Sequence, residues 1–285
     1  MAALKGRVAV VTGATSGIGY ALAGALAAQG MTTVVVGRAE SRAVRAAGEL
    51  SGRTGNPEVF PVGVSDLALR PEVARLAAVL RDRYPRIHLL VHNAGGYFHR
   101  REVTSEGLER TFALNVLAPF LLTSLLASRL QESAPSRVVM VASEAHRHHD
   151  IDFGDLQGDH GYRGYRAYGR SKAELILLAR EFARRFHDVP LTVNAVHPGF
   201  VASGFGRNNG GGTGLAIGLL ARLFGRTVGA AADDLAYVAT DPGLDGTTGA
   251  YFDRRTVRSP SSAASDPVVA LRLFEACAEL SKPFL

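Results

Sequence analysis

The sequence predicts an α/β fold built on one doubly wound, seven-stranded parallel sheet flanked by helices. Short apolar runs rich in β-branched residues alternate with helical patterns along the 285 residues. This alternation is typical of parallel sheets whose strands are joined by helices. Turns of small residues follow several of the runs, at the edge where such sheets bind ligands. Because no repeat or linker divides the chain, we expect one domain over residues 1–285.

The first strand, predicted at residues 7–12, leads through a glycine-rich turn into a helix that begins at Tyr20. Glycine allows a tight turn and a close approach of the backbone to a pyrophosphate, which is favoured at a helix N-terminus. A glycine-rich turn alone is weak evidence, but its position after the first strand strengthens it. We therefore expect dinucleotide contacts from the turn residues Gly13, Thr15, Ser16, Gly17, Ile18 and Gly19.

The end of the second strand, predicted at residues 31–36, bears on the choice of cofactor. An NAD-binding protein would carry an acidic residue there for the ribose hydroxyl, but this chain has Gly37 and Arg38. The planar guanidinium of Arg38 suits a 2′-phosphate, so NADP(H) is favoured and NAD(H) is the weaker alternative. The other interpretation is an arginine that meets only solvent.

A helix over residues 39–51 and a third strand over residues 59–64 come next, and Asp66 follows that strand. The Asp66 carboxylate is placed to meet the adenine side of a dinucleotide. A helix N-cap before Leu67 is the alternative, because aspartate is a preferred N-cap residue.

A helix over residues 71–83 and a strand over residues 87–91 lead to another small-residue turn, residues 93–96, at the ligand-binding edge. The next helical pattern, residues 105–131, contains Asn115 among apolar residues. A buried asparagine is costly unless it is hydrogen-bonded, so Asn115 is either a structural clamp or a site residue.

The fifth strand, predicted at residues 138–143, ends at Ser143 and is followed by a polar insertion over residues 144–167. The insertion contains His146, His148 and His149. Adjacent histidines rarely converge on one metal ion, and no cysteine or glutamate motif accompanies them, so no metal site is expected. We interpret the insertion as a loop that faces solvent or forms the rim of a substrate pocket.

Tyr168 and Lys172 open an apolar helical pattern that runs to residue 187, and their spacing places them on one face. A free phenol has a pKa of about 10, and about 3 to 4 kcal/mol is needed to bring it near 7 or 8. A cation about 4 to 6 Å away supplies an energy of that size. The spacing therefore indicates a poised acid/base pair, although an exposed tyrosine and lysine on a surface helix would show the same pattern.

The rest of the chain completes the sheet. A sixth strand is predicted at residues 191–196, a helix at residues 229–240 and a seventh strand at residues 249–253. Residues 204–227 are glycine-rich and then apolar, which predicts a mobile substrate lid, with attachment to a membrane surface as the alternative. Residues 254–285 form a tail that ends in an amphipathic helical pattern.

The composition argues against several functional classes. The formal charge of +6 comes from arginines scattered along the chain, which does not favour nucleic-acid binding. The single cysteine, Cys277, excludes an intramolecular disulfide and fits a reducing compartment. No apolar stretch reaches the roughly 18 residues of a membrane-spanning helix, so we expect a cytoplasmic protein without stable membrane insertion.

Taken together, six motifs resemble the short-chain dehydrogenase/reductase family. They occur in the family's order and comprise Thr12 to Gly19, Asn93 to Gly95, Asn115, Ser143, Tyr168 to Lys172, and Pro198 with Gly199. Residues 241–252 and the long insertion before Tyr168 are similar to the retinol-dehydrogenase-like subgroup. The resemblance covers essentially the whole chain and implies an NAD(P)-binding Rossmann fold that acts on a small molecule.

The resemblance also implies a catalytic set. Tyr168 would act as general acid/base, and Lys172 would lower its pKa and hold the nicotinamide ribose. Ser143 would orient the substrate oxygen, and Asn115 would anchor a water for proton relay. The other residues that would line the cofactor are Asn93, Ala94, Gly95, Pro198, Gly199, Val201 and Ser203.

The family resemblance further implies a homodimer or homotetramer. The association would use the helices at residues 105–131 and 168–187, whose apolar positions exceed one buried stripe. The alternative is that the tail at residues 254–285 covers that surface.

Three functions fit these residues. The favoured one is NADP(H)-dependent reduction of a ketone or aldehyde, or the reverse alcohol oxidation, on a mostly apolar small molecule. The alternative uses the same fold and tyrosine for non-redox elimination, epimerisation or cyclisation. A nucleotide-sensing protein without turnover is disfavoured by the complete catalytic set.

Overall fold

An eight-stranded sheet in the order β3-β2-β1-β4-β5-β6-β7-β8 is the centre of the computed structural model, which describes residues 4–201 and 226–285. Strands β1 to β7 are parallel, which confirms the predicted α/β fold. The additional strand β8 pairs antiparallel with β7, in the segment predicted as a tail. The strands are β1 (Val8–Thr12), β2 (Thr32–Gly37), β3 (Val59–Gly63), β4 (Leu89–His92), β5 (Ser136–Val141), β6 (Leu191–His197), β7 (Tyr251–Asp253) and β8 (Thr256–Arg258).

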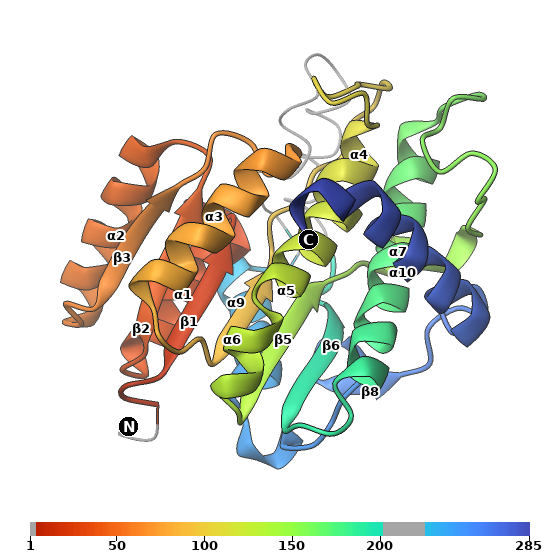
Figure 1. The fold of residues 1–285 in the computed structure, drawn as a ribbon. Coiled ribbons are helices and arrows are strands. Elements are labelled where there is room, and N and C mark those ends of the chain that lie inside the picture. The colour runs from red at the N-terminus through yellow and green to blue at the C-terminus, as the bar shows by residue number, and fades with distance from the viewer. Residues whose placement is uncertain (1–3, 202–225) are drawn as a thin grey trace.

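Helices cover both faces of the sheet (Figure 1). Alternate residues of a strand point to opposite faces, so Val8 and Val10 join one hydrophobic cluster and Ala9 and Val11 join the other. Helices α1, α2 and α9 pack on one face, and α3, α5 and α7 pack on the other. The helices are α1 (Gly17–Ala28), α2 (Glu40–Thr54), α3 (Arg70–Arg83), α4 (Arg110–Phe112), α5 (Ala118–Leu125), α6 (Ala127–Glu132), α7 (Gly164–Arg185), α9 (Val228–Thr240) and α10 (Pro267–Ser281).

The order of the strands creates a crevice between β1 and β4. The chain places β2 and β3 on one side of β1 and then returns to place β4 on the other side. The loops that follow β1 and β4 therefore turn away from each other and leave a crevice at the carboxyl ends of these strands. This is where the predicted glycine turn and the turn at residues 93–96 begin.

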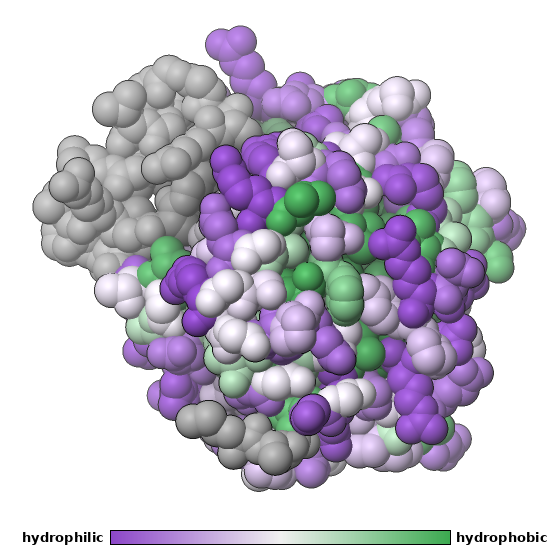
Figure 2. Space-filling view, turned by 90° about the vertical axis from the view of Figure 1, so that its left-hand side faces the viewer, coloured by the Kyte–Doolittle hydropathy of each residue, from purple (hydrophilic) through white to green (hydrophobic). Residues whose placement is uncertain are grey.

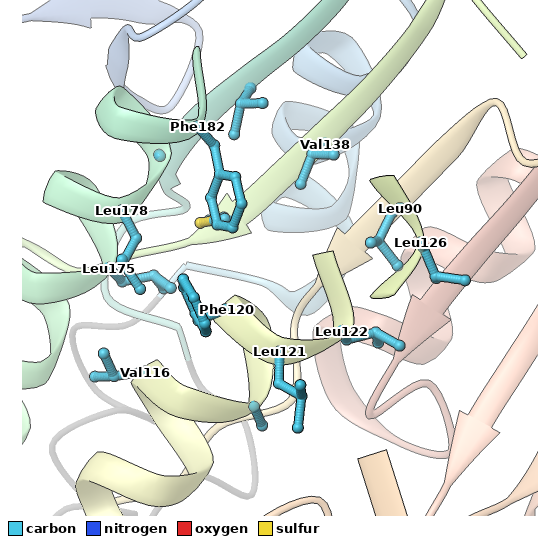
Figure 3. Close-up of a cluster of buried hydrophobic side chains, with 14 of the residues drawn as sticks. Leu90, Val116, Phe120, Leu121, Leu122, Leu126, Val138, Leu175, Leu178 and Phe182 are labelled. Carbon is cyan, nitrogen blue, oxygen red and sulfur yellow. The ribbon is translucent and has the colours of Figure 1, made fainter. Parts of the chain in front are cut away.

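The C-terminal helix α10 covers the outer surface of α5 and α7. Phe274 of α10 packs edge-on against Phe120 of α5 and Phe182 of α7, with ring centroids 4.9 and 5.1 Å apart. Figure 3 shows Phe120 and Phe182 among the buried side chains between these helices and the sheet, together with Leu175 and Leu178. The helical surface expected to bind a second subunit is therefore covered within the chain, as the alternative interpretation of the tail proposed.

The helix predicted over residues 105–131 is divided in the structure. It begins at Arg110, contains a π-helical turn at Ala113–Leu117 and is interrupted at Leu126. The side chain of Glu109 accepts hydrogen bonds from the amides of the first turn and thereby sets the start. Hydrophobic periodicity did not reveal the π-helical turn or the interruption at Leu126, because apolar residues continue across both.

Two predicted boundaries near the site also differ. α7 begins at Gly164, so Tyr168 lies in its second turn. A Cβ atom at Gly164 would lie 2.4 Å from the carbonyl oxygen of Phe98, so only glycine permits this contact. Strand β5 ends at Val141, which leaves Ser143 beyond the ladder of the sheet.

The predicted lid at residues 204–227 lies outside the described residues except for Arg226 and Thr227. The amide of Arg226 donates to the carbonyl oxygen of Phe200 at 2.8 Å, and the side chain of Thr227 caps α9.

Within the described parts of the chain, no helix is both long and apolar enough to cross a bilayer. Figure 2 shows the side of the molecule next to α2 and β3, where hydrophilic residues dominate and hydrophobic residues occur in small groups.

Candidate active site

A cavity of about 1030 Å³ lies at the carboxyl edge of the sheet. Its walls come from the segments that follow β1 to β6 and from α7. Asn115 and Gly19 are buried and do not line it, and Ser203 lies outside the described residues. The predicted residues that line it are Gly13, Thr15, Ser16, Gly17, Ile18, Arg38, Asp66, Asn93, Ala94, Gly95, Ser143, Tyr168, Lys172, Pro198, Gly199 and Val201.

Hydrogen bonds join the turn after β1 to the turn after β4. The side-chain amide of Asn93 donates to the carbonyl oxygens of Thr12 and Gly13 at 2.9 and 3.2 Å. In return, the hydroxyl of Thr12 accepts from the backbone amides of Asn93 and Ala94, both at 3.1 Å. Asn93 therefore shapes the glycine turn as well as lining the cavity.

The glycines of the first turn meet two different demands. Gly13 and Gly17 have positive φ angles of 67° and 58°, a conformation that side chains disfavour. Gly19 provides space instead, because a Cβ atom there would lie 2.3 Å from Nδ2 of Asn93. Gly19 thus lies against Asn93, on the side of the turn away from the cavity. The residues of the turn that line the cavity lie between Gly13 and Ile18.

Two arginines line the end of the cavity beyond β2. Arg38 and Arg42 are both exposed, and neither has an ion-pair partner within the described residues. Gly37 lets the turn after β1 approach the end of β2, because a Cβ atom there would lie 2.2 Å from Cγ2 of Thr15. Sequence reasoning identified Arg38 but missed Arg42, whose signal was its position four residues later, in the first turn of α2. The pair offers two guanidinium groups to an anion.

Asp66 has two partners of its own. Its carboxylate forms an ion pair with Arg110 and accepts from the amide of Ala68 at 3.0 Å. The N-cap of α3 is Leu69, so the helix-cap alternative for Asp66 is wrong, and the carboxylate closes a turn ahead of that helix. Arg110, which sequence reasoning missed, also lines the cavity.

Asn115 clamps the turn after β4 to α7. Its Oδ1 accepts from the amide of Gly96 at 2.8 Å, and its Nδ2 donates to the Gly96 carbonyl at 2.9 Å and to the Ser171 hydroxyl at 3.0 Å. The Ser171 hydroxyl in turn donates to the carbonyl oxygen of Tyr168 at 2.7 Å. Both the oxygen and the nitrogen of the Asn115 amide are therefore hydrogen-bonded. This matches the structural clamp, one of the two roles that the sequence allowed for Asn115.

Tyr168, Ser143 and Lys172 meet on one wall of the cavity. The side chains of Ser143 and Tyr168 are hydrogen-bonded to each other. Nζ of Lys172 lies 5.6 Å from the centroid of the Tyr168 ring and donates to the carbonyl oxygen of Val141 at 2.8 Å. The spacing of Tyr168 and Lys172 on one helical face thus places both groups beside Ser143, and the alternative of an exposed surface pair is wrong.

Burial dominates the titration of both groups. It raises the pKa of Tyr168 to about 12, although the hydrogen bond with Ser143 acts in the opposite direction. Burial also lowers the pKa of Lys172 to about 8. The expected lowering of the Tyr168 pKa is not seen in the structure, because desolvation of the phenolate outweighs the hydrogen bond with Ser143. Tyr168 therefore keeps its proton throughout the neutral range.

Aromatic side chains that sequence reasoning missed line the cavity beyond Tyr168. Tyr97 lies edge-on to Tyr168 with ring centroids 6.1 Å apart, and Phe98 lines the same wall. Tyr165 and Phe200 reach the cavity from α7 and from the segment after β6, and they are 58% and 52% exposed. No local motif marks these residues, because they come from separate parts of the chain. Their rings offer flat apolar surfaces to a ligand.

The insertion at residues 144–167 faces solvent over much of its length and reaches the cavity at Glu144, Ala145 and Tyr165, as predicted for a loop that faces solvent or forms the rim of the pocket. Its first residues form a 3-10 helix, η2 (Glu144–His148), in which His146 is buried. His149 packs against Gly169, where a Cβ atom would lie 1.9 Å from its ring, and its ring lies edge-on to Tyr165. His146 and His149 thus pack against Tyr251 of β7 and against α7.

Glu174 is a buried carboxyl group on α7 that lies outside the cavity. It is 1% exposed, neither oxygen has a hydrogen-bond partner among the described residues, and Nε of Arg170 lies 3.7 Å from Oε1. Burial raises its pKa to about 7, although Arg170 acts in the opposite direction. Since the folded-state pKa exceeds the unfolded-state value of about 4.5, ionisation of Glu174 destabilises the fold as pH rises from about 4.5 to 7.

We therefore expect Glu174→Gln to raise the melting temperature at pH 8 and to leave it nearly unchanged at pH 5. The gain has an upper limit of about 3 kcal/mol, at about 1.4 kcal/mol per pKa unit. Glu181→Gln is the matched control, because Glu181 is also buried on α7 but pairs with Arg184 and Arg185. Its loss should destabilise the protein at pH 8. Equal shifts for Glu174→Gln at both pH values would contradict the prediction.

Comparisons relate the chain to known proteins. A sequence model of the family described as short chain dehydrogenase matches residues 7–211. DnrU from Streptomyces sp. (strain C5), named provisionally as a daunorubicin C-13 ketoreductase, is 40% identical over 277 residues, which are 96% of this chain and 92% of DnrU. Retinol dehydrogenase 14 from Mus musculus is 34% identical over 289 residues and covers 95% of this chain and 85% of its own. The structure of LanV, an angucycline C-6 ketoreductase with bound NADP, has a TM-score of 0.70 and 28% identity, over 89% of this chain and 95% of LanV.

Proposed function

The chain belongs to the short-chain dehydrogenase/reductase family and its retinol-dehydrogenase-like subgroup, and from this premise we propose that it is an NADP(H)-dependent ketone or aldehyde reductase. The observation that carries the proposal is the convergence of Tyr168, Ser143 and Lys172 in the cavity between the glycine turn and the aromatic wall. The substrate would be a mostly apolar small molecule. The reverse reaction, oxidation of the corresponding alcohol, uses the same groups.

The cavity fits a nicotinamide dinucleotide on its own geometry. The backbone from Gly13 to Ile18 faces the cavity at the start of α1, where amide groups favour a pyrophosphate. At the other end, Lys172 and Tyr168 would meet the nicotinamide ribose, and the backbone of Gly95 lies beside Lys172 on the cavity wall. When bound, the cofactor supplies the hydride that reduces the carbonyl carbon.

Residues of the chain would then orient the carbonyl oxygen of the substrate and protonate it. The hydroxyl of Ser143 hydrogen-bonds the carbonyl oxygen and orients it toward Tyr168. As negative charge develops on that oxygen, Tyr168 donates its phenolic proton, and the product is the neutral alcohol. The ammonium group of Lys172 stabilises the phenolate that remains. Asn115 would contribute by holding α7 and the turn at Gly96 in register rather than by touching the substrate.

The proposed choice of a ketone rests on two further observations. Tyr97, Tyr165 and Phe200 give the substrate end flat apolar walls, which suit a ring-bearing ketone. DnrU and LanV are both named as ketoreductases. Incubation of the protein with NADPH and an aryl ketone, with loss of reduced-cofactor absorbance as the readout, tests the function. Tight NADPH binding without oxidation of NADPH by any ketone or aldehyde would favour the non-redox alternative.

We expect the protein to bind NADPH more tightly than NADH, because Arg38 and Arg42 face the cavity without a counter-ion in the described residues. Arg38→Asp should weaken NADPH binding about 10- to 100-fold, which corresponds to the loss of one strong charge-assisted hydrogen-bonding pair. Dissociation constants from fluorescence titration of both cofactors provide the measurement. Arg45→Asp, on the helix α2 that follows Arg38 and paired with Glu49, is the matched control and should change neither constant. Equal affinity of the unmutated protein for NADPH and NADH would refute the assignment.

Other features of the proposal stay predictions. A single domain, a substrate lid over residues 204–227 and a cytoplasmic location belong to the proposed enzyme. A homodimer or homotetramer also stays a prediction, and its interface would have to avoid the surface of α5 and α7 that α10 covers.

A further inference from the structure

We propose that His146 is a positioning residue whose neutral imidazole bridges the backbone of Ser143 to the C-terminal segment and thereby holds the Ser143 hydroxyl toward Tyr168. The inference rests on the proposed function for one point, the role of Ser143 in orienting the substrate oxygen. The bridge itself is a feature of the structure and can be tested without turnover.

His146 has a partner at each ring nitrogen. Its Nδ1 lies 2.8 Å from the carbonyl oxygen of Ser143, and its Nε2 accepts from the amide of Ser261 at 3.2 Å. The residue is 0% exposed, and its ring lies edge-on to Tyr251 with centroids 4.8 Å apart. Because the ring is sealed from solvent, water is not available to replace either partner if one is lost.

The chemistry of the two partners determines the tautomer. A backbone carbonyl oxygen only accepts a hydrogen bond, and a backbone N–H only donates one. Nδ1 must therefore carry the proton, and Nε2 must present its lone pair. Burial lowers the pKa of His146, which keeps the ring neutral at neutral pH. The imidazole is thus a directional connector, with its donor at Ser143 and its acceptor at Ser261.

Ser143 needs such support because it lies beyond the last residue of β5, where strand pairing no longer holds the chain. Its carbonyl oxygen receives both the Nδ1–H and the backbone N–H of His146, the latter at 3.2 Å. Its hydroxyl accepts from the amide of Ala145 at 3.3 Å and is hydrogen-bonded to Tyr168. Loss of the bonds to His146 would free the peptide after Ser143 to rotate, which would displace Ala145, whose amide holds the Ser143 hydroxyl.

The far end of the bridge is anchored. Ser261 starts a turn in which its carbonyl oxygen accepts from the amide of Ala264 at 3.1 Å, and Ala264 is fully buried. Arg147, next to His146, also donates to the carbonyl oxygen of Ser259 at 3.2 Å. The site is thus braced against a segment that lies 115 residues further along the chain from His146.

Two amide substitutions separate the two halves of the bridge. In His146→Asn, the side-chain NH₂ can occupy the place of Nδ1 and keep the bond to Ser143, but nothing reaches Ser261. In His146→Gln, the longer side chain places its oxygen near the position of Nε2 and keeps the bond to Ser261, but the donor to Ser143 is lost. Both variants lose one buried hydrogen bond, so their melting temperatures should fall by similar amounts.

If His146 acts through Ser143, kcat for ketone reduction should fall about 10-fold or more in His146→Gln and stay within about 3-fold of the unmutated value in His146→Asn. The dissociation constant for NADPH should not change in either variant, because neither nitrogen of His146 faces the cavity. Equal losses of kcat in the two variants, or none in either, would overturn the positioning role.

Imidazole ¹⁵N and ¹H NMR of the unmutated protein tests the bridge independently of activity. The signal that disappears in His146→Gln should show the neutral tautomer with the proton on Nδ1 between pH 6 and 8. A proton on Nε2, or rapid averaging of the two tautomers, would overturn the bridge. Absence of ketone reduction together with the Nδ1–H signature would instead count against the proposed function and leave the bridge standing.

Discussion

Replacement of Tyr168 by phenylalanine should abolish ketone reduction while leaving NADPH binding nearly intact. The phenolic oxygen is the group hydrogen-bonded to Ser143 on the cavity wall, and general acid/base groups typically supply about 10²- to 10⁴-fold in rate. The aromatic ring remains in Tyr168→Phe, so its edge-on contact with Tyr97 and the packing of α7 should persist. The measurements are single-turnover oxidation of NADPH with a ketone and a fluorescence titration of NADPH.

Tyr165→Phe is the matched control for Tyr168→Phe. Tyr165 lies on the same helix, also lines the cavity and also carries a phenol, but it is 58% exposed. The Tyr165→Phe variant should keep most of the turnover of the unmutated protein. Substantial activity in Tyr168→Phe would mean that another residue donates the proton. His197 would then be the first candidate, because it lines the cavity.

The raised pKa of Tyr168 favours the direction of reduction. With a pKa of about 12, Tyr168 holds its proton at neutral pH and is ready to donate it. Alcohol oxidation needs the phenolate instead, so its rate should increase with pH until Lys172 loses its proton near pH 8. This is a change from the sequence-based expectation of a depressed phenol pKa. Spacing shows that Lys172 is near Tyr168, but it does not show how strongly both groups are buried.

Much of the site could be predicted because the residues of each of its motifs are close to one another in the sequence. The glycine turn, Arg38 at the end of β2 and the pair Tyr168 and Lys172 each occupy a few neighbouring residues. The alternation of strand and helix patterns then places these segments at one edge of the sheet. Hydrophobic pattern and turn chemistry are thus sufficient for the fold class and for the cofactor side of the cavity.

The substrate side could not be predicted because it depends on contacts between distant segments. Tyr97, Tyr165 and Phe200 come from three parts of the chain that meet only after folding. The same holds for His146, whose partner Ser261 lies 115 residues away. A histidine in a polar insertion resembles a surface residue until the tail that buries it is in place.

Loss of the Lys172 charge should make the protein more stable and nearly inactive. The folded-state pKa of Lys172, about 8, lies below the unfolded-state value of about 10.5 because burial disfavours the ammonium form. Burial of the charge therefore costs stability below pH 8, and that cost fades as pH rises from 8 to 10.5. Lys172→Met keeps the side-chain length, and at pH 7 it should gain up to about 3 kcal/mol, less about 1 kcal/mol for the lost bond to Val141.

Activity should change in the opposite direction, because the phenolate formed when Tyr168 gives up its proton loses its neighbouring cation. We expect kcat of Lys172→Met to fall at least about 100-fold, as for loss of a general acid/base partner. NADPH affinity should fall as well, since a ribose contact is removed.

In the unmutated protein, ketone reduction should decline as pH rises through 8, where the ammonium group of Lys172 loses its proton. This decline should be absent from the residual activity of Lys172→Met. A variant that is less stable at pH 7 would show that the buried charge is compensated in the fold. A variant that is stabilised and fully active would remove Lys172 from the mechanism.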